Sequence, residues 1–442
     1  MKKPERTQST LMSLTTHWSM MLSALLLLAG CAGSSRTMMP VPNVYTGDSP
    51  RELFQELPEE LRGSELDLLY VTDRAPETDS EENLVYGSGR SHSPAFGSAV
   101  VRILPDMDWD QLVRVSLEKD RSTKLKMEMA SIEELGRFPE TPPPLILIDG
   151  EARLDPSNRD QATESERIFR AEVRRRLKRS PRSEILVFVH GYNNDFDDAA
   201  FTLAETWHFM GREFVPILYT WPAGKGGPSG YIYDRESGEF TVHHLKNLIE
   251  DLSNIEEVEA FHMIAHSRGT DVLTSAVRER ALVARARGKE VPDKLRSSHI
   301  ILAAPDLDLD VVSQRVVAEQ LGRETQNITI YTSQTDKAIG IAESMFKSVK
   351  RIGRLDADDL TSRQLESVKY IDGISMVELQ EVEQRKASHS YFHSDPAASS
   401  DLILTVRYGL EPGAENGRPL KPLEANFWQI EPGYPESNVA RD

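Results

Sequence analysis

The middle of the chain alternates short apolar runs with segments of helical periodicity. Residues 185–189 are five apolar residues in a row, and the turn residues HGYNN follow them. A run without polar alternation predicts a strand that is buried on both faces, as in parallel sheets. We also predict strands at 214–221, 259–265, 299–304 and 327–332, which are rich in apolar and β-branched residues.

The segments between these runs carry apolar residues at helical spacing. In the segment 196–210, one helix face would hold Ala199, Ala200, Leu203, Ala204 and Trp207. A second helical segment, 271–287, follows the run that ends at residue 265. The repeated order strand–helix–strand predicts an α/β fold, with a mostly parallel central sheet and helices on both faces.

Weaker patterns flank this repeat. Before it, we predict strands at 66–72 and 97–104 with a turn-rich YGSGRS loop between them, a loosely helical stretch at 106–135, a short strand at 142–150 and a helix at 163–179. The three strands are expected to extend one side of the sheet. Within and after the repeat, we predict an irregular loop at 221–238, a short helix at 243–252, a last strand at 368–371 and a final helix that ends near Tyr408.

The N-terminus has the pattern of a lipoprotein signal peptide, residues 1–30. Basic residues precede an apolar core at 20–28 that is too short to span a bilayer. Small residues then stand before Cys31, the only cysteine of the chain. This resembles a bacterial lipobox, in which the signal is cut before the cysteine and the cysteine is lipidated. The alternative is an ordinary secretory signal with a stray cysteine.

Composition divides the rest of the chain into three parts. Residues 31–63 start with a stretch rich in Ser, Pro and Gly, which predicts a flexible tether from the lipidated cysteine. Residues 64–408 hold the α/β domain, and the Pro-, Gly- and Glu-rich residues 409–442 predict an irregular tail.

The formal net charge of −18 argues against binding to nucleic acid and against adsorption to anionic lipid headgroups. No nucleotide cofactor is expected, because the glycines of 221–238 lack a closing Gly-Lys-Ser/Thr and Ser229 breaks G-x-G-x-x-G. No metal site is expected either. The acidic triple that starts at Asp306 has Val311 and Val317 where a calcium loop needs Gly and Glu.

Ser267 follows an apolar run and precedes a helical pattern, with small residues on both sides. The segment Ala265-His266-Ser267-Arg268-Gly269 is an A-x-S-x-G variant of the nucleophile elbow, a sharp strand–serine–helix turn. A serine hydroxyl is a weak nucleophile until a base takes its proton. The assignment therefore depends on an acid and a histidine farther along the chain.

Two carboxylates and two histidines follow in the required order. Asp336 follows the second strand after the elbow and is favoured as the acid, with Asp306, after the first strand, as the alternative. Both also suit helix N-caps. His389 opens the loop before the last helix and is favoured over His393 as the base. A zinc pair of these two histidines is disfavoured, because Ser390 stands where the metalloprotease motif has Glu.

An acyl-transfer site also needs donors for the oxyanion. We expect them in the backbone N–H of Arg268, next to the serine, and of Tyr192 in the HGYN loop, where Gly191 permits close approach. The side chain of Arg268 is expected to pair with a carboxylate such as Asp271 rather than with substrate.

Several segments, taken together, resemble a bacterial α/β-hydrolase family of undefined function. They are YVTDRAPE (70–77), VFVHGYNN (187–194), YTWP (219–222), MIAHSRG (263–269), AAPDLD (303–308) and HSYF (389–392). The resemblance implies the α/β-hydrolase fold over roughly 66–408 and places Ser267, Asp336 and His389 where the family has its nucleophile, acid and base. Arg268 departs from the usual Met at a position that lines the pocket rim.

These patterns predict a serine hydrolase of the esterase, lipase or thioesterase type at the surface of the bacterial envelope. Its substrate would be a small-molecule or lipid ester. A lipid anchor at Cys31 would hold it to the membrane, and Ala32 favours the outer membrane facing the periplasm. The alternative is a catalytically inactive α/β-hydrolase body that serves as an envelope scaffold or binding module. The sequence predicts no particular protein partner.

Overall fold

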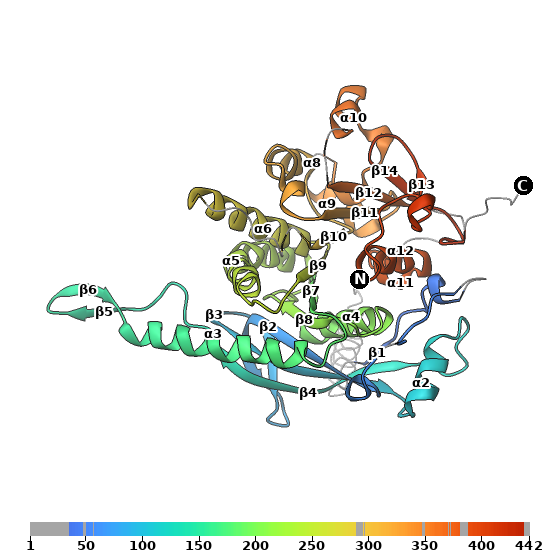
Figure 1. Ribbon diagram of the computed structural model, residues 1–442. Coiled ribbons are helices and arrows are strands. Elements are labelled where there is room, and N and C mark those ends of the chain that lie inside the picture. Colours follow the sequence, from blue (N-terminus) through green and yellow to red (C-terminus); the bar gives the residue numbers. More distant parts are fainter. Residues whose placement is uncertain are drawn as a thin grey trace, which may run out of the picture.

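The computed structural model describes residues 35–46, 50–55, 57–288, 295, 297–346, 350–369, 371, 373–380 and 388–436. In this part of the chain a sheet of 12 strands has the order β1-β4-β3-β2-β8-β7-β9-β10-β11-β12-β14-β13. Figure 1 shows helices on both sides of its central strands. Residues 1–30, assigned to a signal peptide, and Cys31 lie outside the described residues. Within them, no helix is both long and apolar enough to cross a bilayer.

The centre of the sheet is parallel, as predicted. It consists of β8 (Val215–Thr220), β7 (Glu184–Val189), β9 (Ala260–His266), β10 (His299–Ala303), β11 (Asn327–Thr332) and β12 (Ile374–Leu379). Every residue of β8, β9, β10 and β11 is buried. Strands covered on both faces favour apolar residues at consecutive positions, which explains the apolar runs of β7 and β10 in the sequence.

Two hydrophobic cores cover the two faces of the sheet. Successive side chains of a strand point to opposite faces, so Leu186 and Phe188 of β7 enter one core while Ile185 and Val187 enter the other. The first core is closed by α4 (Phe196–Phe209) and α12 (Pro396–Val406). The second is closed by α3 (Pro156–Leu177), α5 (Gly227–Ser253) and α6 (Gly269–Ala286).

An antiparallel extension flanks the parallel centre. β2 (Glu65–Thr78) pairs in parallel with β8, and β3 (Leu84–Leu104), β4 (Lys126–Arg137) and β1 (Ser35–Thr37) follow it outward. Here β2 and β3 extend one side of the sheet, as predicted. The predicted YGSGRS loop is wrong, because these residues continue β3 and pair with β2.

Two further predictions fail in this region. The stretch 106–135 is not one loose helix but α2 (Trp109–Ser116) followed by β4. Because β4 is mostly half-exposed, it lacks a long apolar run. The predicted strand at 142–150 does form as β5 (Leu145–Ile148), but it pairs only with β6 (Glu151–Leu154) in a separate 2-stranded sheet.

The connections after β8 also differ from the prediction. The loop expected at 221–238 ends early, because α5 starts at Gly227 and continues through the short helix expected at 243–252. The strand expected at 368–371 is absent from the described residues of that segment, where α10 (Ser362–Val368) ends. The remaining short helices are α8 (Leu309–Val312), α9 (Lys337–Phe346) and α11 (Tyr391–Ser394).

The described part of 31–63 is not a flexible tether. β1 pairs with β4, and Met38, Val44 and Tyr45 are buried in the first core. Arg36 forms an ion pair of 2.5 Å with the buried carboxylate of Glu205 in α4. These buried apolar residues pack against the body, which composition alone does not reveal.

The tail 409–442 is not irregular throughout. β14 (Phe427–Ile430) pairs in parallel with β12, and β13 (Lys421–Pro422) pairs with β14 at the edge of the sheet. A strand of four residues among Pro, Gly and Glu is too short to stand out as a periodic pattern.

Candidate active site

Ser267 lies in a sharp turn between β9, which ends at His266, and α6, which begins at Gly269. Its φ is +52°, in the left-handed region that non-glycine residues rarely adopt, at a cost of about 1–3 kcal/mol. Hydrogen bonds hold this turn: the serine N–H donates to the carbonyl of Ala303 at 2.9 Å, and its own carbonyl accepts from Thr270 Oγ1 at 2.6 Å. This is the strand–serine–helix arrangement expected of a nucleophile elbow.

Two glycines allow the elbow to meet the neighbouring HGYNN loop. A Cβ atom on Gly191 would lie 2.7 Å from Cβ of Ser267, and one on Gly269 would lie 2.2 Å from the carbonyl oxygen of His190. Both distances are shorter than van der Waals contact. The two positions therefore require glycine because of space, and Gly191 brings its loop directly against the serine.

His389 and Asp336 are joined by a hydrogen bond. His389 Nδ1 donates to Asp336 Oδ2 at 2.8 Å, and the carboxylate is fully buried. The other oxygen, Oδ1, accepts from the backbone N–H groups of Ala338 and Ile339 at 3.0 and 3.1 Å, at the start of α9. Asp336 thus caps a helix and orients the imidazole at the same time, because the cap fixes the carboxylate in place.

The alternative acid and the alternative base have other partners. Asp306 accepts from the Tyr231 hydroxyl at 2.5 Å and lies 3.3 Å from the Arg351 guanidinium. His393 Nδ1 lies 2.9 Å from Glu205 Oε1, on the side of α4. Of the two acids considered, the structure therefore brings Asp336 to His389.

The two residues expected to supply oxyanion donors flank the elbow. Within the described residues, the backbone N–H groups of Tyr192 and Arg268 donate no hydrogen bond. The Tyr192 hydroxyl donates to the carbonyl of Gly227 at 2.9 Å, which ties its loop to the start of α5. The Arg268 side chain pairs with Asp271 at 2.5 Å, the contact expected from the sequence.

The serine and the imidazole are not hydrogen-bonded to each other in this structure. Both residues belong to the described part of the chain, and no hydrogen bond joins Ser267 Oγ to His389 there. The serine itself is only 5% exposed. Catalytic hydrogen bonds are often long before substrate binds. For catalysis, Ser267 Oγ and the His389 imidazole must come within hydrogen-bonding distance of each other.

The sequence did not predict the buried polar cluster of Arg74, His190 and Trp221 next to the HGYNN loop. His190 Nε2 accepts from the backbone N–H of Trp221 at 2.9 Å, and the Trp221 indole donates back to the His190 carbonyl at 2.8 Å. Arg74, which is 1% exposed, donates to the carbonyls of Asn194 at 2.7 Å and Ala223 at 2.8 Å. Burial lowers the pKa of Arg74 to about 10, so the guanidinium stays charged at neutral pH.

His266 supports the loop that carries His389. Its Nε2 donates to the His389 carbonyl at 3.0 Å, and the two ring centroids are 4.7 Å apart. Burial, followed by the neighbouring His389, lowers the pKa of His266 well below its ordinary value, so the ring is neutral at pH 7. This histidine is therefore a packed and hydrogen-bonded residue.

Comparison with known proteins places the chain in a family. Residues 165–407 match the family described as alpha/beta hydrolase of unknown function (DUF900). No curated protein matches significantly. A solved structure, described as a predicted CIB-like hydrolase from Thermoplasma acidophilum, matches 52% of this chain and 88% of its own at 16% identity and a TM-score of 0.29. This TM-score and identity are too low to support an inference about the site. The family match covers more than half of the chain and its central sheet, and the protein therefore belongs to this family of α/β hydrolases.

Proposed function

We propose that the protein is a serine hydrolase that cleaves esters or thioesters through an acyl-enzyme on Ser267. The observation that carries this proposal is the hydrogen bond between His389 and the buried Asp336, with the His389 ring 4.7 Å from that of His266, the residue before Ser267. A carboxylate only accepts hydrogen bonds, so it keeps the proton on Nδ1 and leaves the Nε2 lone pair free to act as a base.

The proposed reaction has two halves. His389 Nε2 takes the Ser267 hydroxyl proton as Oγ bonds to the substrate carbonyl carbon, and it then protonates the departing alcohol or thiol. In the second half, His389 Nε2 takes a proton from water as the water oxygen bonds to the acyl carbon. The bond to Ser267 Oγ then breaks, Oγ regains the proton, and the carboxylic acid is released. The N–H groups of Tyr192 and Arg268 would stabilise the oxyanion, and losing one such donor typically costs about 10²–10³ in rate.

The membrane location belongs to the same proposal. A lipid on Cys31 would be four residue steps from Ser35, where β1 begins to pair with the body. Four extended residues span at most about 14 Å. A lipidated protein would therefore be held close to the bilayer, which suits lipid esters as substrates. Replacing Cys31 by serine should abolish incorporation of labelled palmitate, and unchanged incorporation would exclude this anchor.

A fluorophosphonate probe tests the nucleophile directly. The native protein should be labelled at Ser267, and Ser267→Ala should abolish both the label and the hydrolysis of a short nitrophenyl ester. Ser313→Ala, which changes an exposed serine on the helical segment after α8, is the matched control and should leave both unchanged. If the folded native protein takes no label, the alternative of an inactive body that serves as a scaffold is favoured instead.

A further inference from the structure

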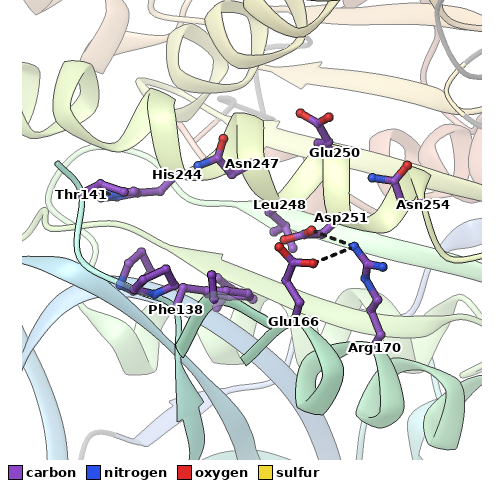
Figure 2. Close-up of a pocket in the computed structure, with 14 residues that line it drawn as sticks. Phe138, Thr141, Glu166, Arg170, His244, Asn247, Leu248, Glu250, Asp251 and Asn254 are labelled. Carbon is purple, nitrogen blue, oxygen red and sulfur yellow. Dashed lines mark hydrogen bonds and ion pairs between the residues drawn. The ribbon is translucent and has the colours of Figure 1, made fainter. Parts of the chain in front are cut away.

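A cavity of about 400 Å³ lies between α3, α5 and the chain that follows β4. None of the residues that line it belongs to the Ser267 site. Figure 2 shows Thr141 and His244 at one end of it and Arg170, Glu166 and Asp251 at the other. Phe138 and Leu248 lie between the two ends. A volume of this size suits a small molecule.

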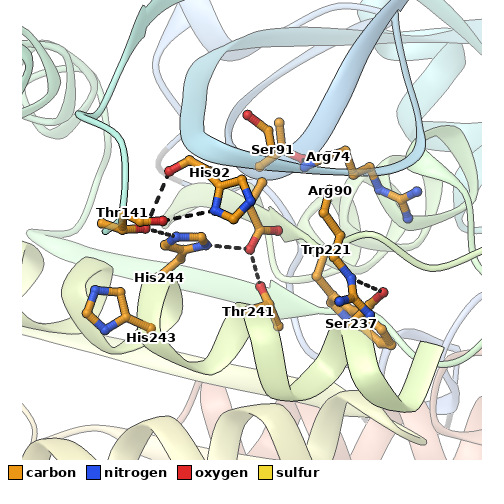
Figure 3. Close-up of polar contacts among 12 residues, drawn as sticks. Arg74, Arg90, Ser91, His92, Thr141, Trp221, Ser237, Thr241, His243 and His244 are labelled. Carbon is orange, nitrogen blue, oxygen red and sulfur yellow. Dashed lines mark hydrogen bonds and ion pairs between the residues drawn. The ribbon is translucent and has the colours of Figure 1, made fainter. Parts of the chain in front are cut away.

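The first end of the cavity holds a hydroxyl, an imidazole and a carboxylate in series. Thr141 Oγ1 lies 2.6 Å from His244 Nε2, and His244 Nδ1 lies 2.7 Å from Asp73 Oδ2. Asp73 is fully buried and also accepts from Thr241 Oγ1 at 2.6 Å. Figure 3 shows Thr141, His244 and Thr241 close together at this end of the cavity. The carboxylate accepts from Nδ1, and in the neutral form of the ring Nε2 can then accept from the Thr141 hydroxyl.

The backbone of Thr141 is held in place by β3. Its N–H donates to the carbonyl of His92 at 2.9 Å, and its own carbonyl lies 3.0 Å from His92 Nδ1. The hydroxyl also lies 3.3 Å from the His92 carbonyl, a longer contact than the one to His244. Thr141 is half-buried and lines the cavity, so its hydroxyl is both fixed and reachable.

The other end of the cavity has an excess of negative charge. Three carboxylates meet two guanidinium groups here: Arg170 Nη2 is shared by Glu166 at 3.1 Å and Asp251 at 3.6 Å, and Glu250, which lines the same wall, lies 3.7 Å from Arg287 Nη1. Burial, followed by the charge of Glu166, raises the pKa of Asp251 to about 7, with Arg170 opposing and Glu250 adding to the shift. A ligand that places a cation here would relieve this repulsion, whereas a carboxylate or phosphate would add to it.

We propose that this cavity is a second nucleophilic site, in which Thr141 accepts the acyl group of an ester whose far end carries a positive charge. Oγ1 of Thr141 bonds to the carbonyl carbon, and its proton passes to His244 Nε2. The bond from that carbon to the alcohol oxygen breaks, and the imidazolium returns the proton to the departing alcohol. The product is an ester of Thr141, and Asp73 is the positioning residue that fixes the imidazole.

The test uses the full chain with Ser267→Ala, so that the proposed hydrolase site does not consume the probe. Three nitrophenyl carbamates of equal length, ending in a methyl, an ammonium or a carboxylate group, transfer a slowly hydrolysed carbamoyl group to reactive hydroxyls. Peptide mass mapping should find the adduct on Thr141, formed fastest from the ammonium probe and slowest from the carboxylate probe. Absence of an adduct on Thr141 in the folded protein would overturn the proposal.

Variants separate a reactive hydroxyl from a passive contact. Thr141→Val should abolish the adduct and Thr141→Ser should retain it. Thr163→Val, at an exposed threonine on α3 that does not line the cavity, should change nothing. His244→Gln should slow carbamoylation at least about 100-fold, as expected when a general base is lost. An adduct that forms at the same rate in folded His244→Gln would show simple surface acylation and refute the role of the imidazole.

Discussion

Replacing Asp336 by asparagine separates the two tasks of this side chain. The asparagine oxygen can still accept from the N–H groups of Ala338 and Ile339, so the cap of α9 and most of the stability should remain. The amide NH₂ would instead face His389 Nδ1, which favours the tautomer with the proton on Nε2. That ring cannot take the Ser267 proton, and a change of this kind costs about 10⁴ in kcat, or about 5 kcal/mol in the barrier.

The assay compares Asp336→Asn with Asp336→Ala for nitrophenyl ester hydrolysis and for urea unfolding. Both variants should lose activity, but only the alanine variant loses the cap, at about 1–2 kcal/mol of unfolding free energy. Asp306→Asn, at the carboxylate that contacts Tyr231 and Arg351, is the control and should keep kcat within about tenfold, because it leaves the imidazole hydrogen bond intact. If the Asp306 variant loses more activity than the Asp336 variant, the assignment of the acid is wrong.

Three further predictions follow from the packing. Gly191→Ala should lower kcat by about 10²–10³, because the new Cβ would displace the oxyanion loop from Ser267; an unchanged kcat would contradict that close approach. Arg74→Met should lower the unfolding free energy in urea by about 3 kcal/mol or more, since it leaves buried carbonyls without donors, and a loss below about 1 kcal/mol would contradict this role. The pKa of Asp251 is raised by burial and Glu166 from 3.8 to about 7, so its contribution to stability is fully present below about pH 4 and is lost as the pH rises through 7. Asp251→Asn should therefore stabilise the protein more at pH 8 than at pH 5, which a higher Tm at pH 8 would report. The gain in unfolding free energy at pH 8 should be at most about 4 kcal/mol. An equal gain at both pH values would contradict the raised pKa.

The parallel centre of the fold is largely readable from the sequence because burial on both faces favours apolar residues. β7 and β10 therefore contain unbroken apolar runs, and the polar residues of β9 and β11, such as His262 and Thr329, are buried as well. The edges of the sheet are not readable in this way. β4 and β14 are half-exposed or only a few residues long, so their pairing partners, far away in the sequence, decide that they are strands.

For the candidate site, the sequence supplied the order of serine, acid and histidine and the small residues around the serine. It left two acids open, because Asp306 and Asp336 both follow strands that end at the same edge of the sheet. It did not indicate the buried polar cluster of Arg74 and His190. A charged residue at the end of a strand cannot be recognised as buried before its hydrogen-bond acceptors are known.

What the sequence determined by itself is local: which segments are buried on both faces, where a serine can stand in a tight turn, and which residues can follow it as acid and base. The tertiary structure decided what depends on a few ångströms between distant segments. Only in the folded chain does His389 bond to Asp336, Arg74 bond to the carbonyl of Asn194 in the HGYNN loop, and Thr141 bond to His244 at the cavity between α3 and α5. The physical reason is that hydrophobic periodicity records burial, which is a property of each residue, whereas a hydrogen bond is a property of a pair and requires both positions.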